Sequence, residues 1–331
     1  MNKIERVKGA LALQEVDRVP ISVWMHFPSV DQDPRTLAEL QVTEQQTYDL
    51  DFIKLMPFGL YSVQDWGCQI KFFCTETGTP VVHKFAIDSA EEWNTIKPLP
   101  PYFGNWGKQL LLAKYVGELV QDEVPFIQTL FSPLTTARKL AGNRIFKDMK
   151  THPDIFHKAL AAITETTINF VRENIKLGVS GFFFATQCAD KELMSDDEFK
   201  AFAEYYDRLV LNEANQGTWF NILHMHGDNI RIDELSNYPV QALNWHDRRV
   251  YPSLKEARSL TDKCLIGGMD EEGALSTGCA DDVVLEVVNA IRQAGSKGLM
   301  LGPGCVAHPD TLAENIAAAR KAVEPDFISQ Q

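Results

Sequence analysis

The sequence predicts an α/β fold, specifically a (β/α)8 TIM barrel, and three observations support this. Eight short apolar, β-branched runs are spread along the 331 residues, segments with helical periodicity separate most of them, and polar residues follow several runs where glycine breaks the pattern. Alternating strands and helices are typical of a parallel sheet covered by its own crossover helices. We therefore expect residues 1–331 to form a single barrel domain, because this length accommodates eight strand-helix units and an insertion.

The expected strands are the eight runs themselves, which are bounded by glycine, proline or polar clusters. They cover residues 19–25, 51–56, 124–130, 180–186, 218–224, 240–245, 264–268 and 298–301. Helical periodicity is clearest over residues 159–177, 196–215 and 281–294. Ser195 and Ser132 each precede a helical pattern, and proline follows Ser132, so both serines are expected N-terminal caps.

One region does not fit the plain alternation of strand and helix. Residues 67–73 and 80–87 are two short runs separated by a turn that contains Gly78. Such a pair is typical of a β-hairpin. We expect this hairpin to be an insertion after the second strand of the barrel.

Composition and charge argue against several classes of function. The chain has 45 acidic and 32 basic residues and a formal net charge of −13, which opposes binding to the phosphate backbone of nucleic acid. The first twenty residues lack the apolar core of a signal peptide, and no later run reaches membrane-spanning length. We therefore expect a cytoplasmic protein with no nucleic-acid or membrane partner, whose six sparse cysteines are free thiols.

Two segments far apart in the sequence predict a metal site. His224-Met225-His226-Gly227 ends one expected strand, and Gly302-Pro303-Gly304-Cys305 follows the last one. Alternate side chains of a strand share a face, and the carboxyl ends of barrel strands meet at one mouth. Three such ligands with one open position are typical of catalytic zinc. The alternative is that the histidines only hydrogen-bond within a polar mouth and that Cys305 is a small buried hydrophobe.

A second polar segment closes the sixth expected strand. It contains His246 and Asp247, followed by two arginines. His246 is a candidate further ligand or general acid/base, and Asp247 is the candidate that orients it. The alternative is a cluster of surface salt bridges without a catalytic role.

Four further residues are candidates for substrate contact. Asp190 and Asp270 follow the fourth and seventh strands, where they can contact substrate or support the ligands. Trp24 and His26 end the first strand, where they would line the pocket. An aromatic residue at such a position is also often a packing residue.

Motifs along nearly the whole chain resemble those of the uroporphyrinogen decarboxylase superfamily. They are Val19-Pro20-Ile21-Ser22-Val23-Trp24, Phe131-Ser132-Pro133-Leu134-Thr135-Thr136-Ala137, Leu193-Met194-Ser195-Asp196-Asp197-Glu198-Phe199, Leu265-Ile266-Gly267-Gly268-Met269-Asp270 and Leu301-Gly302-Pro303-Gly304-Cys305, with Glu314-Asn315-Ile316. Their order and spacing together are specific, although no single motif is. The resemblance implies a (β/α)8 barrel.

The sequence departs from the decarboxylase members of that superfamily at three positions. The resemblance implies arginines just after the first strand, but the chain has Trp24-Met25-His26-Phe27-Pro28 there, with only Arg35 nearby. Phe58 occupies the position of an expected aspartate, and Pro303 that of an expected histidine. These departures disfavour the binding of a substrate with many carboxylates.

The zinc-dependent methyltransferases of the superfamily resemble the chain better at the candidate site. Their His-x-Cys-Gly motif corresponds to His224-Met225-His226-Gly227, and their late cysteine corresponds to Cys305. The resemblance implies methyl transfer between a corrinoid protein and a thiol. His226 replaces a thiolate ligand with a neutral imidazole, which leaves the metal more positive and a bound thiolate less nucleophilic.

The leading hypothesis is a zinc-dependent methyltransferase that activates a thiol or other small nucleophile. The chain contains no segment that resembles a corrinoid-binding module, so a corrinoid would belong to a separate partner protein. The alternatives are a uroporphyrinogen decarboxylase or related tetrapyrrole decarboxylase, and a non-catalytic binding barrel.

Overall fold

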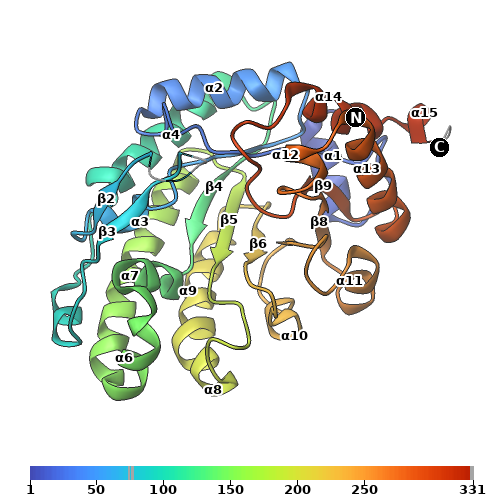
Figure 1. Ribbon diagram of the computed structural model, residues 1–331. Coiled ribbons are helices and arrows are strands. Elements are labelled where there is room, and N and C mark those ends of the chain that lie inside the picture. The colour runs from blue at the N-terminus through green and yellow to red at the C-terminus, as the bar shows by residue number, and fades with distance from the viewer. Residues whose placement is uncertain (74, 76–77, 329–331) are drawn as a thin grey trace.

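A curled parallel β-sheet forms the centre of the molecule (Figure 1). The structure, a computed structural model, describes residues 1–73, 75 and 78–328. The strand order is β1-β4-β5-β6-β7-β8-β9, and every neighbouring pair is parallel. The bounds are β1 Ile53–Lys54, β4 Phe126–Phe131, β5 Gly181–Thr186, β6 Ile222–Met225, β7 Ala242–Trp245, β8 Cys264–Met269 and β9 Leu299–Pro303. Nearly continuous burial of these strands agrees with a parallel sheet covered on both faces.

The first expected strand, residues 19–25, is an irregular extended segment and not a regular strand. On one side, the Ser22 N–H donates to the Leu301 carbonyl at 3.0 Å, and the Leu301 N–H donates to the Pro20 carbonyl at 2.8 Å. On the other side, the Asp51 N–H donates to the Ile21 carbonyl at 2.8 Å. Pro20 has no N–H to donate, so the ladder is interrupted there. The segment nevertheless lies between β9 and the residues that lead into β1, and it is hydrogen-bonded to both.

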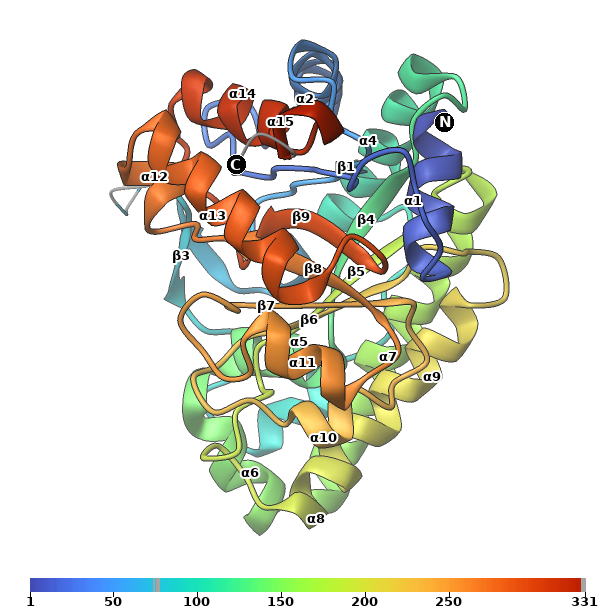
Figure 2. The ribbon, with the colours of Figure 1, turned by 90° about the vertical axis from the view of Figure 1, so that its right-hand side faces the viewer.

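Helices surround the curled sheet on its outer side (Figures 1 and 2). The longer helices are α1 Lys3–Leu11, α2 Pro34–Thr47, α4 Gly104–Val120, α5 Pro133–Ala141, α6 Ile145–Thr151, α7 Pro153–Lys176, α9 Tyr205–Ala214, α11 Leu254–Leu260, α13 Ala280–Ala294 and α14 Ala313–Ala322. The shorter ones are α3 Tyr61–Gln64, α8 Asp196–Phe199, α10 Ile232–Leu235, α12 Ala274–Thr277 and α15 Pro325–Ile328, with 3-10 turns at Glu91–Thr95 and Gly142–Arg144. The molecule therefore has an α/β architecture, as expected.

Local sequence signals explain several helix boundaries. The Ser132 side chain accepts a hydrogen bond from the Thr135 N–H at the start of α5, and Pro133 occupies the first turn. Ser195 forms a capping box with Glu198 at the start of α8. The helix expected over residues 196–215 is interrupted by a π-helical turn, Lys200–Glu204, between α8 and α9.

A small two-stranded sheet lies apart from the main sheet (Figure 1). Its strands, β2 Gln69–Lys71 and β3 Val81–Lys84, pair in antiparallel fashion within the region expected to form a hairpin. Part of the turn between them, Cys74 and residues 76 and 77, lies outside the described residues.

The other five of the six cysteines, Cys68, Cys188, Cys264, Cys279 and Cys305, are free thiols. No helix among the described residues is long and apolar enough to cross a bilayer.

Asp51 anchors the irregular segment to the rest of the sheet. Its fully buried carboxylate accepts hydrogen bonds from Arg6 at 2.7 Å, from Arg18 at 2.5 Å and from the Ile21 N–H at 2.8 Å. We expect Asp51→Asn to lower the free energy of unfolding by about 3–5 kcal/mol, because it removes the fully buried counter-charge that Arg6 and Arg18 share and leaves them only more exposed carboxylates such as Asp17 and Asp49. Urea unfolding measures this loss. Exposed Glu123, changed to Gln, is the control, and a loss for Asp51→Asn as small as that of the control would contradict the role.

Candidate metal centre

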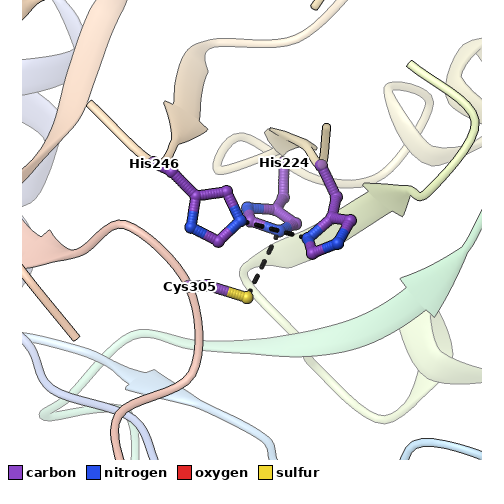
Figure 3. Close-up of side chains that lie close together, drawn as sticks. His224, His246 and Cys305 are labelled. Atoms are coloured by element: carbon purple, nitrogen blue, oxygen red, sulfur yellow. Dashed lines mark hydrogen bonds between the residues drawn. The ribbon is translucent and has the colours of Figure 1, made fainter. Parts of the chain in front are cut away.

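Three imidazoles and one thiol meet at the carboxyl ends of three strands (Figure 3). His224 lies within β6 and His226 directly follows it, while His246 follows β7 and Cys305 lies two residues after β9. One ligand atom from each residue can be chosen so that all four lie within 4.8 Å of one another. The Cys305 Sγ is 3.7 Å from His224 Nε2, and His246 Nε2 is 3.1 Å from His226 Nδ1. The structure thus places the three expected ligands and His246 together.

Two of the distances between these donor atoms are close to those around a tetrahedral zinc ion, and all four atoms lie within 4.8 Å of one another. Zinc–nitrogen bonds of about 2.0–2.1 Å and zinc–sulfur bonds of about 2.3 Å place neighbouring ligand atoms roughly 3.3–3.7 Å apart. The distances of 3.7 Å and 3.1 Å between the donor pairs are close to that range. Nitrogen and thiolate sulfur are also the ligands that zinc prefers. The residues present therefore fit the metal that the sequence motifs imply.

Asn244 fixes the tautomer of His224. The Asn244 amide nitrogen donates to the carbonyls of Ile266 at 3.0 Å and Pro303 at 3.1 Å. Its Oδ1 consequently faces His224 Nδ1, at 2.7 Å, and accepts the proton there. The Nε2 atom of His224 is left unprotonated and directed at Cys305, as a metal ligand requires.

Glu271, and not Asp247 as expected from the sequence, contacts the His246 ring and orients it. The Glu271 Oε1 atom lies 2.6 Å from His246 Nδ1, and Arg249 also donates to this carboxylate. Asp247 instead accepts the Gly268 N–H at 3.0 and 3.1 Å and is buried. Among the carboxylates after β8, the sequence-based candidate was Asp270 and not Glu271. Asn244 was not a candidate. The available signal for Asn244 was its position in β7 two residues before His246, which directly follows that strand, so that alternation places both side chains on one face.

The electrostatics of the cluster favour a thiolate at Cys305. Burial alone would raise the pKa of this thiol, but the positive charge of His224 when that imidazole is protonated, together with hydrogen bonds with the three histidines, brings it well below its usual value. Burial likewise opposes the charged form of His246, and hydrogen bonds to Cys305 and Glu271 outweigh it, raising the pKa of His246 to about 10. The thiolate is the form of cysteine that binds metals.

Two cavities border the cluster. The first, which we call the mouth cavity, has a volume of about 480 Å³ and is bordered by His226 and His246. The second, which we call the inner pocket, has a volume of about 110 Å³ and is bordered by His224 and Cys305. The cluster therefore contributes side chains to a larger space and to a smaller one.

The four expected substrate residues lie at different distances from these cavities. Trp24 and His26 both line the inner pocket. Asp190 lines the mouth cavity and accepts the backbone N–H groups of Asp228 and Asn229, at 3.0 and 3.1 Å, so it organises the loop after His226. Asp270 accepts the Glu272 N–H at 3.1 Å and lies 3.4 Å from the Arg249 guanidinium. Asp270 therefore supports a loop and does not line either cavity.

A curled parallel sheet that gathers three imidazoles and a thiol at its carboxyl edge defines an α/β enzyme with a site suited to a transition metal. The chain belongs to the uroporphyrinogen decarboxylase (URO-D) family, whose model matches residues 2–325.

Curated relatives that match along most of the chain are methyltransferases. The methylcobamide:CoM methyltransferase MtbA of Methanosarcina mazei is 23% identical over 318 residues, covering 91% of this chain and 92% of the relative. The methylcobamide:CoM methyltransferase MtaA of Methanosarcina barkeri is 24% identical over 331 residues, covering 95% of each chain. These matches support methyltransferase as the class of enzyme.

Solved structures show the same fold. A methyltransferase from Methanosarcina mazei superposes with a TM-score of 0.83 at 21% identity, covering 99% of each chain. A B12-independent methionine synthase from Shewanella sp. W3-18-1 superposes with a TM-score of 0.56 at 12% identity, covering 96% of this chain and 94% of the other. At these identities the likeness concerns the fold alone.

Proposed function

We propose that the chain is a zinc-dependent methyltransferase that moves a methyl group from a methylated corrinoid, carried by a separate protein, to a thiol or other small nucleophile. The metal ligands are His224, His226 and Cys305. The observation that carries the proposal is the four-donor cluster, whose residues line two cavities. We also propose that residues 19–25 complete a full (β/α)8 barrel as its eighth, irregular strand, and that the β2–β3 pair is an insertion into it.

The metal, when bound, supplies a Lewis acid that stabilises the acceptor as a thiolate near neutral pH. The protein residues supply the rest. Asn244 and Glu271 orient the imidazoles, and the inner pocket holds the acceptor beside Cys305. The Nε2 atom of His246 lies 3.1 Å from His226 Nδ1 and within 4.8 Å of the other two donors, so His246 would be the candidate fourth ligand.

The location of the cavities supports separate places for the two substrates. The mouth cavity is more than four times the volume of the inner pocket, so it suits the approach of a large donor. The inner pocket suits a small acceptor. We propose that the methyl group passes between them at the cluster, because its residues line both cavities.

The test is an anaerobic assay with methylcobalamin as donor and a panel of small thiols as acceptors, using protein purified without chelator. We expect one zinc ion per chain and formation of the methyl thioether. His224→Ala should lose both, whereas His152→Ala, a change outside the cluster, should keep both. Absence of zinc from the unaltered protein would remove the proposal. Loss of acetate carboxyls from a porphyrinogen at enzymatic rates would assign a decarboxylase, and thiol binding without turnover would indicate a binding protein.

The residues behind the ligands should also affect metal affinity. Asn244→Ala and Glu271→Gln are each expected to weaken zinc binding by about 10- to 100-fold, because partners of this kind orient the imidazole and raise its basicity. Competition with a chromophoric chelator measures the affinity. Asn289→Ala, which alters an amide hydrogen-bonded to Arg248 away from the cluster, is the matched control. Affinities within twofold of the unaltered protein for both variants would contradict the assigned roles.

A further inference from the structure

One residue lines both of the cavities that border the cluster. Gln187 directly follows β5 and is half-buried, and among the described residues it alone belongs to the lining of both the mouth cavity and the inner pocket. The four donors are divided between the two spaces, with His226 and His246 on the mouth cavity and His224 and Cys305 on the inner pocket. From the position of Gln187, one side chain is within reach of either space.

Hydrogen bonds fix the backbone of Gln187. Its N–H donates to Thr135 Oγ1 at 2.8 Å, and its carbonyl accepts from Arg138 Nη1 at 2.9 Å. Thr135 is itself fully buried in the first turn of α5. The preceding carbonyl, that of Thr186, accepts the N–H of the candidate ligand His226 at 3.0 Å. The base of the Gln187 side chain is thus held in a fixed relation to the cluster.

The side-chain amide of Gln187 has no hydrogen-bond partner among the residues that the structure describes. Because its backbone polar groups are already engaged, this amide is what the residue offers to a ligand. Charged neighbours on the mouth cavity are engaged as well, since Arg249 donates to Glu271 and Glu272, and Asp190 accepts backbone N–H groups. A glutamine amide is neutral and has both an acceptor oxygen and two N–H donors.

The chemistry of a neutral amide suits a ligand group of the same kind. A primary carboxamide can pair with the Gln187 amide through two hydrogen bonds, because each group can donate one N–H and accept another. The corrin ring of a methylcobamide carries carboxamide groups around its edge, whereas a simple thiol carries none. The mouth cavity, with the larger volume of about 480 Å³, is also the space that suits this donor. The corrinoid is therefore the substrate that the free amide fits.

We propose that Gln187 is a specificity-determining residue for the methyl donor, and that its amide pairs with a carboxamide at the edge of the corrin ring. This pair sets the orientation of the ring relative to the cluster, because the backbone beside Gln187 is hydrogen-bonded to that of His226. The identity of the donor rests on the proposed function. Recognition of the carboxamide does not require that a methyl group be transferred.

The direct test measures binding of methylcobalamin to the zinc-loaded protein without acceptor, by equilibrium dialysis and the absorbance of the corrinoid. Gln187→Leu keeps nearly the same side-chain size and removes both hydrogen bonds. We expect it to raise the Kd by about 10- to 100-fold, since each neutral hydrogen bond contributes about 3- to 10-fold. Gln216→Leu, at an exposed glutamine that lines neither cavity, is the matched control and should bind as the unaltered protein does.

A change in the donor complements the change in the protein. Methylcobaloxime has a methyl–cobalt bond but no carboxamide, so Gln187→Leu should leave its Kd within twofold of the unaltered value. An unchanged Kd for methylcobalamin in this variant would overturn the proposal. An equal loss of binding for methylcobaloxime would also overturn it, because the effect would then come from the shape of the site.

The integrity of the variant is checked by its zinc content and its thermal unfolding midpoint, both of which should match the unaltered protein. Gln187→Met, whose unbranched side chain follows the path of glutamine, is the second variant and should weaken methylcobalamin binding by the same factor. Full binding of methylcobalamin by the methionine variant would contradict a role for the amide.

Steady-state kinetics distinguish contact with the donor from contact with the acceptor. Gln187→Leu should raise the KM for methylcobalamin and leave the KM for the thiol within twofold. A rise confined to the thiol KM would contradict donor recognition. Corrinoid binding that depends on Gln187, without methyl transfer to any thiol, would leave this contact standing and remove the methyltransferase. Methyl transfer with an unchanged methylcobalamin Kd in the variant would do the reverse.

Discussion

Replacing Cys305 with alanine is expected to remove stoichiometric zinc and to lower methyl transfer by at least about 1000-fold. Cys305 supplies the one thiolate of the cluster, and its Sγ lies 3.7 Å from His224 Nε2. Without it, three imidazoles, none of which carries a negative charge, remain to bind the cation. Loss of a Lewis acid that contributes several kcal/mol of stabilisation corresponds to a rate loss of this size.

Metal analysis by mass spectrometry and the anaerobic methyl-transfer assay measure the two effects on the same preparation. Cys279→Ala is the matched control, because Cys279 is an exposed thiol outside the cluster. It should retain zinc and activity. If Cys305→Ala kept a full complement of zinc, the metal would have to be bound elsewhere, and the assignment of the site would be wrong.

Gly304→Ala is expected to lower methyl transfer by about 100-fold through misplacement of Cys305. A Cβ atom at Gly304 would lie 2.9 Å from the His246 Cα, from the Trp245 carbonyl oxygen and from a Glu271 carboxylate oxygen. Two of these atoms belong to the backbone and cannot rotate away, so the loop that carries Cys305 has to shift. A displacement on the order of 1 Å at a reacting centre costs about 100-fold in rate.

The effect of Gly304→Ala should be local. Zinc affinity and methyl transfer should both fall, while the urea unfolding midpoint changes little. Gly117→Ala in α4 is the control, because the nearest atom to a Cβ there lies at 3.4 Å, an ordinary contact distance. Unchanged activity in Gly304→Ala would show that the loop tolerates movement and that close approach at this glycine is not required.

The sequence predicted the parts of the fold that depend on local pattern. The runs expected as strands over residues 180–186 and 264–268 correspond to β5 Gly181–Thr186 and β8 Cys264–Met269. The run expected over residues 19–25 is irregular, because Pro20 cannot take part in a regular ladder and the segment is held by isolated bridges and by Asp51. A run of apolar residues indicates that a segment is buried. It does not show which of the segment's backbone N–H and carbonyl groups form hydrogen bonds.

The sequence predicted the part of the candidate site that depends on spacing along one strand and on the meeting of strand ends at one mouth. His224 and His226 belong together by alternation, and Cys305 was assigned to the same mouth by topology. The role of Glu271 depends on what another strand brings near it, which no local pattern contains.

The two cavities that border the cluster have a kinetic consequence. If donor and acceptor occupy separate spaces, both can be bound at once, and the methyl group passes directly between them. Initial-rate plots should then intersect, as in a sequential mechanism, and should not be parallel. A methyl group made chiral with hydrogen isotopes should emerge with inverted configuration, because a single displacement across the cluster inverts the carbon once.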